Sequence, residues 1–199
     1  HLNRHYVLNA IPREKDVDVL GERALGAFYT GRNPVVPPPV GAVQTILATF
    51  PSTPSSGPRG NFSAEGGSAS GGQLSTAKVA VVGLGFLIGK PIAEWLKSKT
   101  KELYLLDDKS DLGILKEVDL IISGTGHAGL LKPETLKVGA GVIDFGYAEG
   151  PDGELLGDLD ASLSSVMSHL SFYTPTPGGT GPIVVALLFR NFYTLTLPR

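Results

Sequence analysis

Short apolar runs alternate with segments of helical periodicity between residues 74 and 175. Residues 79–82 form an apolar run whose length and β-branching predict a buried strand. After a glycine turn, residues 90–99 place apolar side chains at helical spacing, which predicts an amphipathic helix. Further strands are predicted at 102–108, 119–126 and 141–146, with short helices or turns at 112–118 and 132–140. This alternation predicts the α/β class, with a Rossmann-type parallel sheet.

The apolar pattern is less regular outside this region. Residues 13–20 alternate charged and apolar side chains, which indicates an edge strand or a solvated loop. A proline-rich segment, 33–41, leads into a predicted helix at 42–50. Residues 51–73 consist mainly of Ser, Gly and Pro, a composition typical of a flexible linker. Residues 181–195 are apolar on nearly every side of the helix they predict, which is typical of burial on several sides.

The segment YTPTPGGTGP (173–182) concentrates proline and glycine just before that last predicted helix. Proline fixes φ and glycine permits positive φ, so the backbone is held in one unusual path. A connector to a surface helix needs no such restriction. The segment is therefore a candidate for a backbone that is shaped to hold a ligand.

A glycine-rich turn follows the first predicted strand. Its glycines are Gly83, Gly85 and Gly89, and the segment opens a predicted helix. Gly83 can make the tight turn, and Gly85 lets the backbone approach a pyrophosphate, which the free N–H groups at the helix N-terminus attract. The spacing is one residue longer than that of the commonest dinucleotide-binding motif. Its interpretation as a binding site therefore depends on its position between a strand and a helix.

Two acids, Asp107 and Asp108, close the next predicted strand. An acid at this place accepts hydrogen bonds from the adenosine ribose of a dinucleotide and repels a 2′-phosphate. The glycine turn carries no Arg or Lys before Lys90. The cofactor expected is NAD or NADP, and both observations favour NAD. The alternative is a plain βα turn beside a solvated strand end.

Few other residues are candidates for chemistry. His127 follows the third predicted strand, where it is either a surface residue or a ligand contact. Asp144 ends the fourth, and we expect it to cap the following turn. The four histidines show no metal-ligand spacing, so no metal site is predicted. Hydride transfer fits this sparse set of side chains, because the cofactor carries the reaction.

Composition narrows the class of protein further. The 199 residues have a formal net charge of −2 and contain no cysteine. Disulfides, thiolate metal sites and a cysteine nucleophile are thereby excluded. The charge balance predicts no nucleic-acid partner, and no apolar run approaches the length of a membrane span. We expect a cytoplasmic protein.

Taken in order, several segments resemble the methylenetetrahydrofolate dehydrogenase/cyclohydrolase (FolD) family. They are EKDVDVL, PPPVG, VAVVGLGFLIGKP, VIDFG, LLGDLD and YTPTPGGTGPIVVALL. The resemblance runs from about residue 10 to 195, interrupted at 51–73, and its last segment is the most specific. It implies oxidation of 5,10-methylenetetrahydrofolate to 5,10-methenyltetrahydrofolate with NAD(P), in a family that also hydrolyses the methenyl product. It further implies tetrahydrofolate derivatives as ligands and a homodimer.

The resemblance also implies roles for individual residues. Asp18 matches the aspartate that binds the pterin ring, a role that suits a carboxylate accepting two hydrogen bonds. The turn Pro177, Gly178 and Gly179 matches the part of the family fold that forms the folate and nicotinamide pocket. The remaining matches concern the cofactor: Gly83, Leu84 and Gly85 in the phosphate-binding turn, and Tyr147, whose backbone contacts the nicotinamide side.

The sequence departs from the family pattern at several places. The Tyr-x-x-x-Lys motif of the cyclohydrolase step is absent from the first 50 residues, so the catalytic residues are unknown and that step is in doubt. Val19 replaces the glycine after the pterin aspartate. Leu84-Gly85 replaces Arg-Ser in the phosphate turn, and Asp107-Asp108 replaces His-Ser. The last two changes favour NAD.

The resemblance implies a division of the chain. Residues 1–50 would be a remnant of the N-terminal folate-binding and catalytic domain, most of which would be missing, so the second α/β domain is partial. Residues 51–73 would be the linker, 74–175 the NAD(P)-binding Rossmann domain, and 176–199 the proline–glycine turn with a helix returning to the N-terminal domain. Without its partner that helix would expose a large apolar patch.

Other functions remain open at this point. The chain could be a non-catalytic nucleotide-binding paralogue, or an incomplete fragment of a longer bifunctional enzyme. A dehydrogenase for amino or shikimate-type acids would share the architecture, but it would need a Lys–Asp or His pair at the nicotinamide, and none is found.

Overall fold

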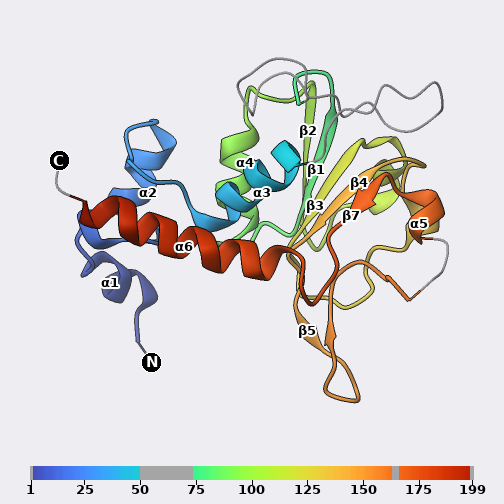
Figure 1. The fold of residues 1–199 in the computed structure, drawn as a ribbon. Coiled ribbons are helices and arrows are strands. Elements are labelled where there is room, and N and C mark those ends of the chain that lie inside the picture. Colours follow the sequence, from blue (N-terminus) through green and yellow to red (C-terminus); the bar gives the residue numbers. More distant parts are fainter. Residues whose placement is uncertain (1, 50–73, 163–165, 198–199) are drawn as a thin grey trace.

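A five-stranded parallel sheet forms the centre of the molecule (Figure 1). The structure is a computed structural model that describes residues 2–49, 74–162 and 166–197; the predicted linker, 51–73, lies outside them. The strand order is β2-β1-β3-β4-β7, and every neighbouring pair is parallel. The strands are β1 (Lys78–Val82), β2 (Glu102–Leu106), β3 (Leu120–Ser123), β4 (Gly141–Asp144) and β7 (Phe172–Tyr173). The predicted α/β class with a Rossmann-type parallel sheet is confirmed.

Helices and one small hairpin surround the sheet. The α-helices are α1 (Arg4–Asn9), α2 (Glu22–Tyr29), α3 (Pro38–Thr49), α4 (Gly89–Leu96), α5 (Val166–His169) and α6 (Thr180–Thr196). The short 3-10 helices are η1 (Arg13–Lys15), η2 (Leu112–Glu117) and η3 (Pro133–Thr135). The antiparallel hairpin pairs β5 (Ala148–Glu149) with β6 (Leu155–Leu156) and projects from the lower edge of the sheet in Figure 1.

The two faces of the sheet bury two separate cores, because successive strand residues point to opposite sides. Val79 and Val81 lie in one core with residues of α3 and α4. Ala80 and Val82 lie in the other, with leucines from η2 and the later loops. The three central strands, β1, β3 and β4, are buried on both faces, as parallel strands generally are, whereas the edge strands β2 and β7 are partly exposed. This is why the central strands read as continuous apolar runs in the sequence.

Helix α3 packs against α4 and α6, so it joins the sheet to the terminal helix. It begins at Pro38, earlier than the predicted start at residue 42, because proline is tolerated in the first turn of a helix. Gly41 lets α6 approach closely, since a Cβ there would lie 3.1 Å from Leu187 Cδ1. The sequence pattern alone did not indicate this contact.

Residues 13–20 are not an edge strand. They form η1 and a tight loop, in which the buried Asp16 carboxylate accepts hydrogen bonds from the backbone N–H groups of Leu20 and Gly21. A local side-chain acceptor of this kind competes with strand pairing for the backbone donors. The other alternative, a loop, is confirmed.

Some predicted elements are shorter than expected, and others were not predicted. The helix after the glycine turn ends at Leu96, and Ser98 just beyond it has a φ of 62°. β7 and the β5–β6 hairpin have only two residues per strand, too few for a hydrophobic period.

Helix α6 runs from the lower edge of the sheet to a position beside α1 and α2, so the first and last helices lie on the same side of the molecule (Figure 1). Only Thr180, Leu187 and Asn191 of this helix are buried. The expectation of burial on several sides is therefore wrong for the described chain. Several large apolar side chains of α6 are exposed, among them Val185, Phe189, Phe192 and Tyr193.

Candidate functional site

The glycine turn joins β1 to α4 at the carboxyl edge of the sheet. Gly83 has a φ of 86°, and a Cβ there would lie 2.8 Å from the carbonyl oxygen of Gly124. Gly89 packs so closely on Gly83 that a side chain would collide with the Gly83 carbonyl. Gly85 is different, because nothing lies within 4 Å of the place where its Cβ would be. The first and last glycines are required by the fold, whereas the middle one faces open space.

A cleft of about 520 Å³ lies in front of this turn. It occupies the place where β1 has β2 on one side and β3 on the other, which is the switch point where open α/β sheets bind ligands. Five predicted site residues lie together in its lining: Gly83, Leu84, Gly85, Asp107 and Asp108. The rest of the lining is Val82, Ser110, Leu112, Gly124, Thr125, His127 and Leu130.

Asp107 is held in place by its own loop. Its carboxylate accepts hydrogen bonds from the Lys109 N–H at 3.1 Å and the Ser110 Oγ at 2.7 Å. These hydrogen bonds, that of Ser110 above all, lower the pKa of the Asp107 carboxyl. The group is therefore a fixed, exposed anion at one end of the cleft, suited to accept hydrogen bonds from a diol.

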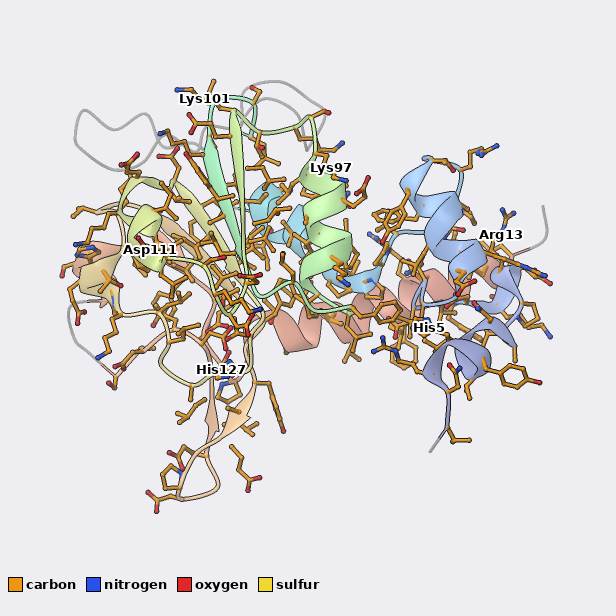
Figure 2. All side chains as sticks on the ribbon, turned by 180° about the vertical axis from the view of Figure 1, so that it is seen from behind. His5, Arg13, Lys97, Lys101, Asp111 and His127 are labelled. Carbon is orange, nitrogen blue, oxygen red and sulfur yellow. The ribbon has the colours of Figure 1, made fainter. Side chains whose placement is uncertain are left out.

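His127 also lines the cleft, and it lies near the base of the β5–β6 hairpin (Figure 2). Its side chain is exposed, and its backbone N–H donates to Thr125 Oγ1 and to Asp158 Oδ1. That it contacts a ligand stays a prediction.

Two buried aspartates, Asp144 and Asp158, accept hydrogen bonds from the loops that follow β3, β4 and β6. Asp144 accepts hydrogen bonds from the N–H groups of Gly146 and Leu159, which is the capping role expected for it. Burial raises the pKa of Asp144 to about 6, despite these hydrogen bonds. Asp158 lies in the LLGDLD segment; the sequence marked this segment but assigned no role to the residue.

The proline–glycine turn has the unusual backbone expected of it. Gly178 has a φ of 98°, and a side chain on Gly179 would collide with the Pro175 carbonyl. The hydroxyl of Thr180 donates to the backbone oxygen of Asp144 at 3.0 Å. The turn is therefore fixed to the carboxyl end of β4, with Pro177 and Gly178 exposed.

The other predicted site residues do not line the cleft at the glycine turn. Asp18 is half-buried in the loop after η1, and its pKa is raised by burial first and by the nearby Asp16 second. The side chain of Tyr147 is 67% exposed, and its carbonyl lies against Gly126. Neither these two residues nor the turn 177–179 is part of the lining.

Val19, beside Asp18, adopts a backbone conformation that favours glycine. Its φ is 58°, in the left-handed region where a β-branched residue is strained, and its side chain is 1% exposed. The resemblance described above implies a glycine at this place. The turn after Asp18 thus keeps a glycine-like shape although the glycine is replaced.

Two further hollows open on the described surface. One of about 480 Å³ adjoins Asp144 and the start of the proline–glycine turn. Another of about 630 Å³ lies over η1 and α2, and its lining includes Arg13, Arg23 and Arg32. Neither contains a residue predicted to bind the cofactor or the substrate.

Within the described part of the chain, no group of three or more His, Cys, Asp or Glu side chains is placed to hold a metal ion. None of the described helices has the length and apolar character needed to cross a membrane.

Comparison with known proteins places this cleft in a family context. The family model of the tetrahydrofolate dehydrogenase/cyclohydrolase NAD(P)-binding domain matches residues 68–197. The chain is 29% identical over 194 residues to bifunctional protein FolD of Listeria innocua, a match that covers 96% of this chain and 60% of the relative. It is 32% identical over 187 residues to FolD of Nocardia farcinica, covering 93% of this chain and 58% of the relative. The chain thus spans about three fifths of the length of these relatives.

A solved structure of similar fold is known with a nucleotide bound. It is the Trypanosoma brucei methylenetetrahydrofolate dehydrogenase-cyclohydrolase complexed with NADP cofactor and inhibitor, with a TM-score of 0.77 and 25% identity. That match covers 98% of this chain and 62% of the other. The FolD crystal structure from Campylobacter jejuni has a TM-score of 0.79 at 24% identity, covering 98% of this chain and 63% of that one.

Proposed function

Because the chain belongs to the tetrahydrofolate dehydrogenase/cyclohydrolase family, we propose that it binds a nicotinamide dinucleotide in the cleft at the glycine turn and takes part in the oxidation of 5,10-methylenetetrahydrofolate. The observation that carries the proposal is the joint placement of the glycine turn and Asp107 at the switch point of the sheet. Binding energy there would orient the two reactants, and orientation is worth about 7–11 kcal/mol of barrier in the best cases.

The residues of the cleft fit a dinucleotide. The open space at Gly85 leaves room for a pyrophosphate close to the backbone, at the start of α4. The ionised Asp107 would accept hydrogen bonds from the adenosine ribose, with Asp108 beside it. When bound, the nicotinamide supplies the hydride acceptor. The chain supplies the shape of the pocket and the position of the ring.

We propose NAD as the preferred cofactor. Two carboxylates at the ribose end of the cleft would repel a 2′-phosphate, and Leu84 offers no positive charge to it. The Trypanosoma brucei protein was solved with NADP, so a cleft of this fold can also accommodate NADP. The proposed preference for NAD over NADP therefore depends on Asp107 and Asp108 of this chain.

Substrate contacts are proposed at the other end of the site. Asp18 would hold the pterin ring, and Pro177, Gly178 and Gly179 would shape the pocket for folate and nicotinamide, with Tyr147 beside the nicotinamide. The fixed backbone of the turn supports this role. The cyclohydrolase step is not included, because residues 1–50 contain no Tyr-x-x-x-Lys motif. The same proposal includes a homodimer, a cytoplasmic location and the division of the chain into residues 1–50, 74–175 and 176–199.

The first test is binding by calorimetry, with NAD and NADP titrated separately into the chain. We expect NAD to bind at least about tenfold more tightly than NADP. Methylenetetrahydrofolate is then added, and reduced nicotinamide is followed by its absorbance. Binding followed by reduction supports the dehydrogenase. Binding without reduction supports the alternative, a nucleotide-binding chain whose chemistry needs a further polypeptide.

A matched pair of glycine variants locates the binding site. Gly85→Ala and Gly26→Ala each add a methyl group where nothing lies within 4 Å, so neither should change stability through a clash. Only Gly85 lines the cleft. We expect Gly85→Ala to weaken dinucleotide binding about tenfold or more while Gly26→Ala leaves it unchanged. Equal affinities in the two variants would contradict binding at the glycine turn.

A further inference from the structure

We propose that Asp158 is a positioning residue that fixes the wall of the cofactor cleft formed by residues 124–127. The inference rests on the proposed function, because it concerns the shape of the same cleft. Asp158 does not line the cleft and is fully buried behind it. Its effect is exerted through the backbone that it binds.

The Asp158 carboxylate accepts three hydrogen bonds from the segment that ends β3. Ser123 Oγ donates to Oδ2 at 2.5 Å and the Thr125 N–H donates to the same oxygen at 2.7 Å. The His127 N–H donates to Oδ1 at 3.0 Å. Hydrogen bonds to an ionised acceptor are stronger than neutral ones, and these hold alternate residues of the loop against one buried group.

The loop held in this way touches the glycine turn directly. A Cβ on Gly83 would lie 2.8 Å from the Gly124 oxygen and 2.9 Å from Thr125 Cγ2. Gly124, Thr125 and His127 also form part of the cleft lining. A shift of this loop would therefore either close on the glycine turn or widen the space in front of it. The loop position sets the width of the cleft.

Two glycines let the carboxylates reach these positions. A side chain on Gly146 would collide with the Asp158 carboxylate, and a side chain on Gly157 would collide with the Asp144 carboxylate. Asp144 in turn accepts the Leu159 N–H at 2.8 Å. The VIDFG and LLGDLD segments thus interlock, with each contributing the glycine that makes room for the other's aspartate. This gives Asp158 a rigid base.

The experiment compares Asp158→Asn with a control, Asp119→Asn. Asp119 directly precedes the first residue of β3, whereas the loop that Asp158 binds follows the last one. Asp119 accepts the Lys78 N–H at 2.9 Å and forms an ion pair with Lys137, far from the cleft lining. Both variants keep the side-chain volume and remove an acceptor of backbone hydrogen bonds. The thermal midpoint, the NAD dissociation constant and the exchange rates of the backbone amides are measured for both, with binding tested well below either midpoint.

We expect Asp158→Asn to raise the NAD dissociation constant about tenfold or more, because the amide nitrogen replaces one of the two carboxylate oxygens and cannot accept from the loop donor that faces it. The Thr125 amide or the His127 amide, whichever faces the nitrogen, should exchange faster in this variant. Asp119→Asn should lower the thermal midpoint and leave the dissociation constant and those two amides unchanged.

Several results would overturn this role. An unchanged dissociation constant in Asp158→Asn would show that the residue is structural only. An equal rise in both variants would assign the effect to general loss of stability. Absence of NAD binding by the unaltered chain would contradict the proposed function and this role together, whereas the first two results leave the proposed function intact.

Discussion

Asp144 combines two opposing influences at the scale of a single residue. It accepts two backbone N–H groups, which favour the ionised form, yet burial raises its pKa to about 6 and the nearby Asp158 adds to the rise. Proton binding is thus tighter in the folded chain than in the unfolded chain, where the ordinary value is 3.8. The ionisation of this one carboxyl opposes folding at neutral pH.

The pH dependence follows from the sign of this shift. The stabilisation from the protonated Asp144 is complete below pH 3.8, is lost as pH rises to about 6, and is constant above that. The loss amounts to about 3 kcal/mol. We expect the free energy of unfolding, relative to that of Asp144→Asn, to fall by this amount between pH 3.8 and pH 7. Urea denaturation of both chains across this range measures it, and parallel pH profiles would contradict the shifted pKa.

At the scale of elements, one buried polar side chain joins α6 to two parts of the N-terminal segment, in addition to the packing of α6 on α3. Asn191 is 2% exposed, and its Nδ2 donates to the backbone oxygens of Val17 at 2.9 Å and Val36 at 2.8 Å. Val17 precedes the proposed pterin ligand, Asp18. The same amide therefore joins the terminal helix to the loop that presents Asp18 and to the segment that leads into α3.

Removal of this amide should loosen all three segments. Asn191→Ala leaves two carbonyl oxygens without their donor, and each buried group left unpaired costs about 1–3 kcal/mol. We expect a destabilisation of about 2–6 kcal/mol by urea denaturation. Thr194→Val, which removes a hydroxyl bonded within the exposed side of α6, is the control and should change stability by less than about 1 kcal/mol. Equal losses of stability in the two variants would show that the Asn191 hydrogen bonds contribute no more than an exposed hydroxyl.

At the scale of the whole molecule, α6 carries an exposed apolar stripe. Val185, Phe189, Phe192 and Tyr193 are 53%, 66%, 57% and 64% exposed, and their helical spacing places them on one side. Patches of this kind mark interaction surfaces or promote aggregation. The match to the Listeria innocua protein covers 60% of that protein, so two fifths of its residues have no counterpart in this chain.

We expect this stripe to cause self-association of the chain. Sedimentation velocity should show a weight-average sedimentation coefficient that rises with protein concentration. The double substitution Phe189→Glu and Phe192→Glu should abolish the rise without lowering the thermal midpoint, because both side chains are exposed. Leu187→Glu, on the buried side of the same helix, should unfold the protein. A chain that stays monomeric at every concentration would contradict the prediction.

Local pattern was sufficient for the fold class and for half of the site. β1, β3 and β4 were predictable because buried parallel strands are continuous apolar runs, and β2 from its short, largely apolar run between the helix after the glycine turn and Asp107. The glycine turn was predictable because its glycines follow a strand and open a helix, and Asp107 because it comes at the end of the next strand. Both signals lie in the local order of the chain, although the packing of Gly83 against Gly124 joins distant residues.

The sequence by itself thus determined the class, the main strands and the cleft residues at the glycine turn. Only the tertiary structure decided the two-residue β7, the interlock of Asp144 with Asp158, and the attachment of α6 through Asn191. It also separated Asp18 and Tyr147 from the lining of the cleft. The physical reason is that buried hydrogen bonds and close packing join residues far apart in the chain, and no local periodicity records which donor will meet which acceptor.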